Sequence, residues 1–339
     1  MSRTVIAGLD GSRESFAAAE WAAHEAKLRG ASLKLVNVWE SVPLVQAPFL
    51  SAENEQQWAE QLPREAGEEL RKVHPELDIT VEQLTGRPAD VLPELTKDAE
   101  LLVLGSSGLG GITGFLVGSV GQAVVSRAEG PVVLVRALTA ADDTNGTNNA
   151  NNTNNANNTN GTDGAGTTGT TGTTEGTQNA DGAETADSRT GREVQGDPEG
   201  PVVLGLNANE PDEALIRFAY EAAQRHGLPL KVVHSWNLPP YFAYGLPPDP
   251  QLNAELGRIE AETLTEVLDA WRPTYPSVEV LEQAAPGKAV EQLVEASRGA
   301  SLLVVGRRMR RAPFGGRIGS VAHAVLHHAT APVAVIPQQ

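Results

Sequence analysis

The sequence predicts an α/β protein built from two tandem doubly wound domains, each with a mostly parallel five-stranded sheet and helices on both faces. Two observations lead to this fold class. Short apolar segments alternate along the chain with longer segments of helical periodicity, which is typical of parallel strands joined by helices. The same series of segments also occurs twice, before and after a stretch with almost no large apolar residue. The length of 339 residues suits two such domains.

The first copy begins and ends with a strand. Short, apolar, β-branched segments predict strands at 4–10, 32–39, 78–85, 99–106 and 131–136. Helices are expected between them, at 12–30, 51–73, 88–98 and 118–128. In the first helix, Phe16, Ala19, Ala23 and Ala26 share one face, and Gly30 is suited to end it. Right-handed crossovers between parallel strands then give the doubly wound arrangement.

The second copy repeats these segments in the same order. "LKLVNVW" at 33–39 matches "LKVVHSW" at 230–236, and "GSVGQAVVSRAEGPVVLV" at 118–135 matches "GSVAHAVLHHATAPVAVI" at 319–336. A repeat of this length indicates a duplicated domain, because solenoid repeats are much shorter. We therefore expect one domain at 1–138 and a second at 200–339.

The segment between the copies, 139–199, consists almost entirely of Asn, Thr, Gly, Ala and Asp. Such a composition buries too little apolar surface to offset the conformational entropy lost on folding. It predicts a disordered linker.

Composition excludes several classes of protein. The net charge of −17 disfavours nonspecific binding to nucleic acid or to acidic membranes. The absence of cysteine excludes disulfides and thiolate chemistry. No apolar run approaches the roughly 20 residues that span a bilayer, and the apolar start is too short for a signal peptide. A cytoplasmic protein without nucleic-acid or membrane partners is expected.

The segment "GSSGLGGITGFLVGSV" at 105–120 holds six glycines between a predicted strand and a predicted helix. A helix N-terminus offers unpaired N–H groups to an anion, and glycines let phosphate oxygens approach the backbone. The segment lacks the lysine of the usual nucleotide-hydrolase loop, and no dinucleotide fingerprint follows the first strand. A phosphate cradle and a mobile loop at the sheet edge both remain open on glycine content alone.

The spacing Gly105-x2-Gly108-x9-Gly118-Ser119 resembles the ATP-binding pattern of the universal stress protein family. The first strand, which leads into Asp10, is similar to the opening strand of that family. The resemblance covers both copies. It implies domains of the adenine nucleotide alpha hydrolase-like kind that bind ATP, act in stress adaptation and often form dimers.

The resemblance assigns the adenosine end of the nucleotide to the first two strands. Asp10 is expected to face the ribose or adenine, Gly8 to let the base approach, and Val38 to meet the adenine through its backbone. An Asp before Gly-Ser also suits a simple turn or helix cap, which is the alternative for Asp10.

The phosphate end is assigned to the glycine-rich segment. Gly105 and Gly108 are expected to line the ribose and first phosphates, and Gly118, Ser119 and Val120 to present N–H groups to the later ones. A Mg²⁺ ion is compatible with this site because Mg²⁺ favours phosphates and waters over a protein cage.

The second copy departs from this pattern. Asn207 stands in place of Asp10, and Met309 in place of Gly108, although Gly306 and Gly319 persist. A methionine side chain would occupy space that the pattern leaves open. We therefore expect a degenerate site here and ATP in the first domain only.

No catalytic machinery stands out. No nucleophile–base pair or carboxylate pair occurs at a telling spacing, and the His323 and His327 pair lacks the third ligand of a zinc site. Three functions stay open: an ATP-binding regulatory module, a slow ATPase on the same site, and an interaction protein that binds no nucleotide.

Each copy ends in a short apolar strand, at 131–135 and 332–336. A terminal strand exposes a sheet edge that favours pairing. We expect the two domains to dock on each other through these strands, and a homodimer is also compatible with them.

Overall fold

The computed structural model describes residues 3–40, 52–106, 117–137, 200–238, 249–308 and 318–338. The chain divides into two units, Met1–Ala137 with Pro198–Gln339, and Leu138–Asp197. All described residues belong to the first unit, which contains both repeats. The predicted linker at 139–199 lies outside the described residues.

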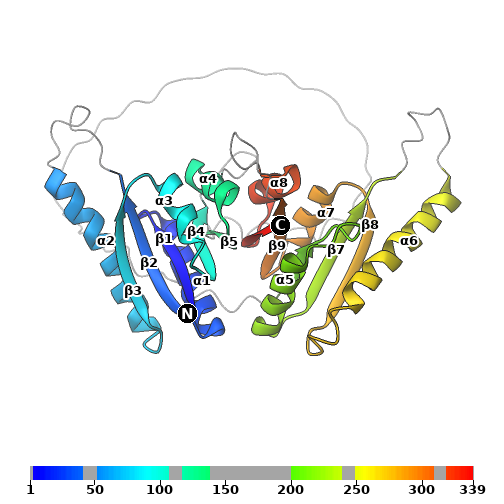
Figure 1. The fold of residues 1–339 in the computed structure, drawn as a ribbon, viewed down its shortest axis with the longest axis horizontal. Coiled ribbons are helices and arrows are strands. Elements are labelled where there is room, and N and C mark those ends of the chain that lie inside the picture. The colour runs from blue at the N-terminus through cyan, green and yellow to red at the C-terminus, as the bar shows by residue number, and fades with distance from the viewer. Residues whose placement is uncertain are drawn as a thin grey trace, which may run out of the picture. The chain divides into compact units, whose positions relative to one another are not determined.

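The first repeat alternates strands and helices in the predicted order (Figure 1). Its elements are β1 Thr4–Leu9, α1 Arg13–Arg29, β2 Ser32–Trp39, α2 Ala52–Val73, β3 Ile79–Thr85, α3 Pro88–Leu95, β4 Leu101–Ser106, α4 Ser119–Arg127 and β5 Val132–Arg136. The periodicity therefore located every element within a few residues, with α3 ending three residues earlier than expected.

The second repeat has the same order. Its elements are β6 Val202–Gly205, α5 Glu213–His226, β7 Leu230–Trp236, α6 Pro250–Asp269, β8 Val280–Pro286, α7 Ala289–Ala296, β9 Leu302–Arg308, α8 Ser320–His328 and β10 Val333–Gln338. None of the helices in the described part of the chain is long and apolar enough to cross a membrane.

The strands form one sheet of ten, in the order β3-β2-β1-β4-β5-β10-β9-β6-β7-β8. Within each repeat all neighbouring strands are parallel. In the first repeat β1 lies between β2 and β4, so the strand order reverses there. This confirms the doubly wound fold and places the ligand-binding crevice expected for it at the carboxyl ends of β1 and β4.

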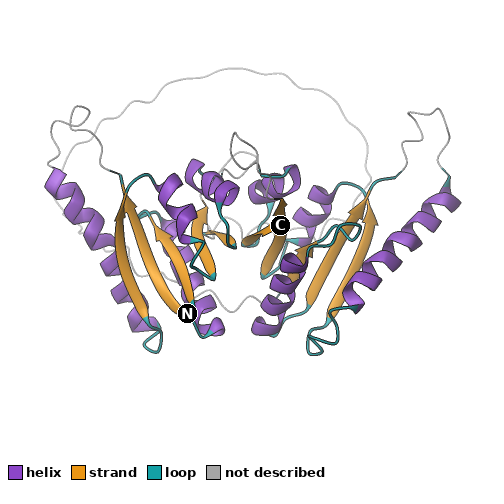
Figure 2. Cartoon of the chain, viewed as in Figure 1, coloured by secondary structure: helices purple, strands orange, loops and turns teal. Residues whose placement is uncertain are grey.

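Helices cover both faces of the sheet in each repeat (Figure 2). One buried cluster joins the strands to α1, α2, α5 and α6, and the other joins them to α3, α4, α7 and α8. Five fully buried alanines let α1 lie close to the strands: Ala18, Ala19, Ala22, Ala23 and Ala26. The crevice is therefore flanked by α1 on one face and by α3 and α4 on the other.

Helix α1 has well-defined ends. The hydroxyl of Ser12 accepts a hydrogen bond from the backbone N–H of Ser15 at 3.1 Å, which caps the first turn. Gly30 ends the helix with φ of 60°, a left-handed conformation that favours glycine. The prediction for Gly30 is confirmed.

The two repeats join through their last strands. β5 and β10 pair antiparallel, with Val133 opposite Ala334. The guanidinium of Arg307 donates to the carbonyls of Ser126 and Ala128 at the end of α4, and Arg136 donates to Leu326 O near the end of α8 at 2.8 Å. Each arginine thus satisfies carbonyls that a helix C-terminus leaves unpaired in the other repeat. The two domains pair within one chain, as the terminal strands predicted.

Candidate functional site

A pocket of about 220 Å³ lies at the carboxyl ends of β1, β2 and β4 in the first repeat. The N-terminal turns of α3 and α4 close its other sides, and Ser15 of α1 reaches it. Parallel strands bring their carboxyl ends to one edge of the sheet, so segments far apart in the sequence meet here.

Seven of the eight residues expected from the sequence line this one pocket. They are Gly8, Asp10, Val38, Gly105, Gly118, Ser119 and Val120. The eighth, Gly108, falls in 107–116, outside the described residues. The structure therefore brings the adenosine-side and phosphate-side candidates together, as a single ligand spanning both would require.

One end of the pocket is polar and suits an anion. Helix α4 starts at Ser119, and its first intrahelical bond runs from Gln122 N to Gly118 O at 3.0 Å. The N–H groups of Ser119, Val120 and Gly121 precede that bond and line the pocket. The positive end of the helix dipole lies at the same place.

The other end is apolar. Val36, Leu92 and Leu104 are buried, and the partly buried Val38 packs against the same cluster. All four side chains line the pocket. This part of the lining suits an apolar group, and the same pocket includes the start of α4.

Asp10 follows β1 and lines the pocket. Its Oδ1 accepts hydrogen bonds from the backbone N–H of Ser12 at 2.9 Å and from the Ser12 hydroxyl. Burial alone would raise the pKa of Asp10, but the hydrogen bonds from Ser12 and Ser15 lower it below its ordinary value. The carboxylate is ionised at neutral pH and suits a ligand hydroxyl as hydrogen-bond acceptor.

Two glycines of the predicted pattern differ in what a side chain at each position would contact. A Cβ on Gly105 would stand 2.5 Å from the carbonyl carbon of Glu14 and 2.6 Å from Ser15 N, so a side chain there collides with the start of α1. A Cβ on Gly118 meets nothing within 4 Å, and its φ of −58° strains no residue. Gly105 is therefore needed for packing, whereas no described atom crowds a side chain at position 118.

The equivalent region of the second repeat is arranged differently. The amide of Asn207 lies 3.4 Å from Glu210 Oε2, and Glu210 forms an ion pair with Arg308 at the end of β9. Ser235 replaces the apolar Val38. The neutral Asn207 thus contacts a carboxylate of its own repeat. Met309 lies outside the described residues.

A buried histidine reinforces that difference. His234 stands at the position of Asn37 in β2, and its Nε2 lies 2.9 Å from Glu260 Oε2 of α6. Glu260 also accepts a hydrogen bond from the Asn209 amide at 3.2 Å. This network ties the loop after β6 to α6, whereas in the first repeat the Asn37 amide donates to Leu9 O at 2.8 Å.

The Asp-Gly-Ser turn given as the alternative for Asp10 is present, since Ser12 donates to Asp10 Oδ1, but sequence reasoning missed Ser15. Ser15 is buried, and its hydroxyl lies 3.4 Å from Asp10 N and donates to Ser12 O at 2.8 Å. The signal was present in the Asp-Gly-Ser turn followed by a second serine three residues on. Capping of α1 and positioning of Asp10 are therefore two results of one turn.

The histidines of α8 take part in the contact between repeats. The rings of His323 and His327 lie 4.6 Å apart between centroids, and His327 Nε2 is 3.4 Å from the Gln122 amide of α4. Among the described residues, no group of three or more side chains suited to a metal ion is found.

Both repeats match the same known protein family. A model of the universal stress protein family matches residues 1–136 and 200–337. A universal stress protein of Mycobacterium tuberculosis is 29% identical over 343 residues, covering 98% of this chain and 97% of that protein. One of Mycolicibacterium smegmatis is 26% identical over 344 residues, covering 98% and 96%.

One solved structure is similar in fold over the full length of this chain. The crystal structure of a universal stress protein from Archaeoglobus fulgidus matches with a TM-score of 0.64 and 15% sequence identity. The match covers 100% of this chain and 99% of that one. At this identity the likeness concerns the fold.

Proposed function

Since the chain belongs to the universal stress protein family, with two tandem repeats that both match it, we propose that it is an ATP-binding regulatory module of stress adaptation. The first repeat holds the nucleotide, and the second supplies the docking surface through β10. The nucleotide-bound state is then the signal that a partner reads.

One observation carries this proposal. Seven residues chosen from spacing and family resemblance line a single pocket, which is apolar at β2 and polar at the start of α4. Adenine suits the apolar end, and a ribose hydroxyl suits the carboxylate of Asp10. The phosphates suit the N–H groups of Ser119 and Val120. A Mg²⁺ ion would be held by the phosphates and its own waters.

A slow ATPase on the same site is the alternative. Asp10 is the carboxylate among the described residues that line the pocket, and its lowered pKa makes it a weak general base. A regulatory role therefore predicts that bound ATP stays intact over many minutes. Stoichiometric phosphate release in a single-turnover experiment would favour the ATPase.

The first variant pair compares the two repeats. Asp10→Ala is expected to weaken ATP binding at least about tenfold, because it removes a hydrogen bond to a charged group. Asn207→Ala, the matched change in the second repeat, is expected to leave ATP affinity unchanged. Calorimetric titration measures both. Loss of binding on changing Asn207 alone would reverse the assigned roles, and no binding by the wild-type chain would favour the interaction protein.

A further inference from the structure

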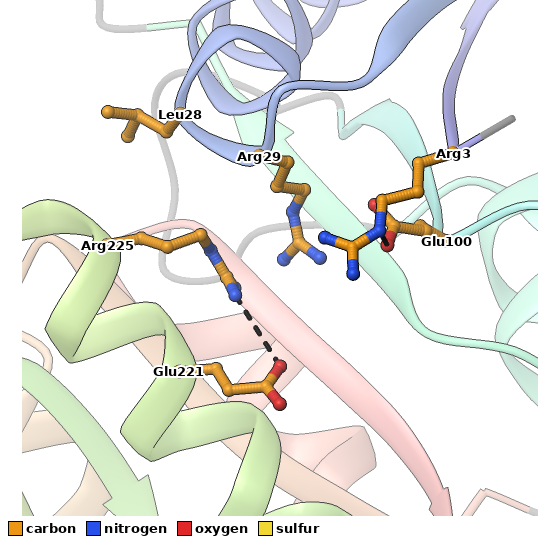
Figure 3. Close-up of a pocket in the computed structure, with 6 residues that line it drawn as sticks. All are labelled: Arg3, Leu28, Arg29, Glu100, Glu221 and Arg225. Atoms are coloured by element: carbon orange, nitrogen blue, oxygen red, sulfur yellow. Dashed lines mark ion pairs between the residues drawn. The ribbon is translucent and has the colours of Figure 1, made fainter. Parts of the chain in front are cut away.

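A second cavity lies between the two repeats, away from the pocket described above (Figure 3). It is lined by Arg3 before β1, Leu28 and Arg29 at the end of α1, Glu100 before β4, and Glu221 and Arg225 on α5. Ser15 lines the first pocket and Arg29 the second, which puts roughly 21 Å of α1 between them. The two sites are therefore separate.

Three guanidinium groups face this cavity from three elements, as Figure 3 shows. The side chain of Arg29 is 8% exposed, and its Nη2 is buried without a hydrogen-bond partner. Arg225 Nε is also buried without a hydrogen-bond partner, while Arg225 Nη2 makes no hydrogen bond and lies 3.6 Å from Glu25 Oε1. Buried N–H groups are rarely left without an acceptor, because their desolvation is then uncompensated.

The ion pairs around the cavity fall into two kinds. Glu25, which does not line the cavity, lies 2.6 Å from Arg29 Nε and 2.8 Å from His226 Nε2, which are strong hydrogen bonds. The pairs of the cavity itself are looser, at 3.4 Å for Arg3–Glu100 and 3.5 Å for Arg225–Glu221. The Glu25–His226 contact links α1 of the first repeat to α5 of the second, and the looser pairs of the cavity leave donors available to a ligand.

Two of the guanidinium groups share one carboxylate. Burial lowers the pKa of Arg225, the positive charge of Arg29 lowers it further, and the charges of Glu25 and Glu221 oppose this shift. Both arginines pair with Glu25, at 2.6 Å for Arg29 and 3.6 Å for Arg225. An anion would accept hydrogen bonds from Arg29 Nη2 and Arg225 Nε, which that carboxylate leaves without an acceptor.

The cavity also offers an acceptor. Glu100 Oε2 is buried without a partner, so a ligand hydroxyl would satisfy it. The volume of about 420 Å³ equals that of roughly 14 water molecules, which leaves room for more than one phosphate ion. A tetrahedral phosphoryl group can accept from three guanidinium groups in different directions, whereas a planar carboxylate matches one or two.

We propose that this cavity binds a small phosphorylated polyol, with its phosphoryl group held by Arg3, Arg29 and Arg225 and a hydroxyl donating to Glu100. Because both repeats contribute residues, occupancy links α1 to α5 and stabilises the paired state of the chain. This proposal does not depend on ATP binding in the first pocket.

Titration of the full chain with glycerol 3-phosphate tests it. One site per chain is expected, with affinity that falls as salt is added. Arg3→Gln and Arg225→Gln are each expected to weaken binding about tenfold or more, the effect of one hydrogen bond to a charged group. Arg258→Gln is the matched control, because Arg258 is an exposed, ion-paired arginine on α6 outside the cavity.

Two further titrations test whether the polyol hydroxyl contributes to binding and which of the two pockets holds the ligand. Inorganic phosphate is expected to bind about tenfold more weakly than glycerol 3-phosphate, because it carries no polyol hydroxyl for Glu100. The Gly118→Val variant is expected to bind glycerol 3-phosphate as the wild type does. The proposal is overturned if wild-type chain shows no binding, if Arg225→Gln binds equally well, or if inorganic phosphate binds as tightly. Loss of binding in Gly118→Val would move the ligand to the first pocket and also overturn it.

Discussion

Gly118→Val is expected to lower the ATP affinity of the chain at least about a hundredfold while the fold persists. A Cβ at residue 118 meets no described atom within 4 Å, and Gly118 lines the pocket together with Ser119 and Val120. We therefore expect a valine here to exclude phosphate oxygens from the N–H groups of those two residues. Several hydrogen bonds to a charged ligand are then lost together. The backbone at 118, with φ of −58° and ψ of 158°, accepts valine without strain.

Gly319→Val is the matched control. Gly319 precedes α8 as Gly118 precedes α4, has φ of −61°, and a Cβ there also meets nothing within 4 Å. Both changes share any small cost of valine at a helix N-cap, at most about 1 kcal/mol. ATP titration and thermal unfolding compare the two variants. Equal ATP affinity in Gly118→Val and wild type would remove the phosphate assignment.

Glu25→Gln is expected to destabilise the chain by about 3 kcal/mol, the usual effect of removing one partner from a buried ion pair. The side chain of Glu25 is 3% exposed and faces three cationic groups, Arg29 on its own helix and Arg225 and His226 on α5. Glutamine keeps the shape but leaves the two arginines without their shared counter-charge. Urea unfolding at neutral pH measures the loss.

The control for this change is Glu221→Gln on α5. The Glu221 side chain is 42% exposed and lies 3.5 Å from Arg225. Exposed pairs contribute little, so a change within about 0.5 kcal/mol is expected. If Glu25→Gln were as mild as Glu221→Gln, the buried cluster would not hold the repeats together.

Low pH is expected to remove the contribution of Glu25 to the stability of the folded chain. Burial alone would raise the pKa of Glu25, but the hydrogen bond with His226 and the charges of Arg29, His226 and Arg225 lower it to about 2 in the folded chain. The unfolded chain, with the ordinary value of 4.5, takes up the proton first. Stability from Glu25 is therefore complete above about pH 4.5 and is lost as the pH falls toward 2. The difference between wild type and Glu25→Gln should shrink over that range.

The strands, helices and pocket residues were predictable because their signals are local. Short β-branched runs marked the strands, Gly30 marked the end of α1, and the spacing from Gly105 to Ser119 marked the first turn of α4. Right-handed crossovers favour the doubly wound fold, but that β1 and β4 are neighbours is a finding of the structure. The assignments of Gly108 and Met309 stay predictions.

The contacts between repeats were not predictable in the same way. Glu25 lies on the buried alanine face of α1, where a charged residue has no local reason to be, and its partner His226 is 201 residues away. The β5–β10 pairing, which joins the two repeats, is a contact between segments about 200 residues apart. Gly105 shows a similar limit, since the sequence suggested a ligand while the geometry shows that its missing side chain lets α1 approach β4.

The first repeat alone is expected to hold an adenine nucleotide. Calorimetric titration of the purified, nucleotide-free chain with ATP and Mg²⁺ tests this most directly. It measures the number of ATP sites per chain, which distinguishes binding by one repeat from binding by both. One tight site per chain is the predicted result. Two equal sites per chain, or no binding at all, would contradict it.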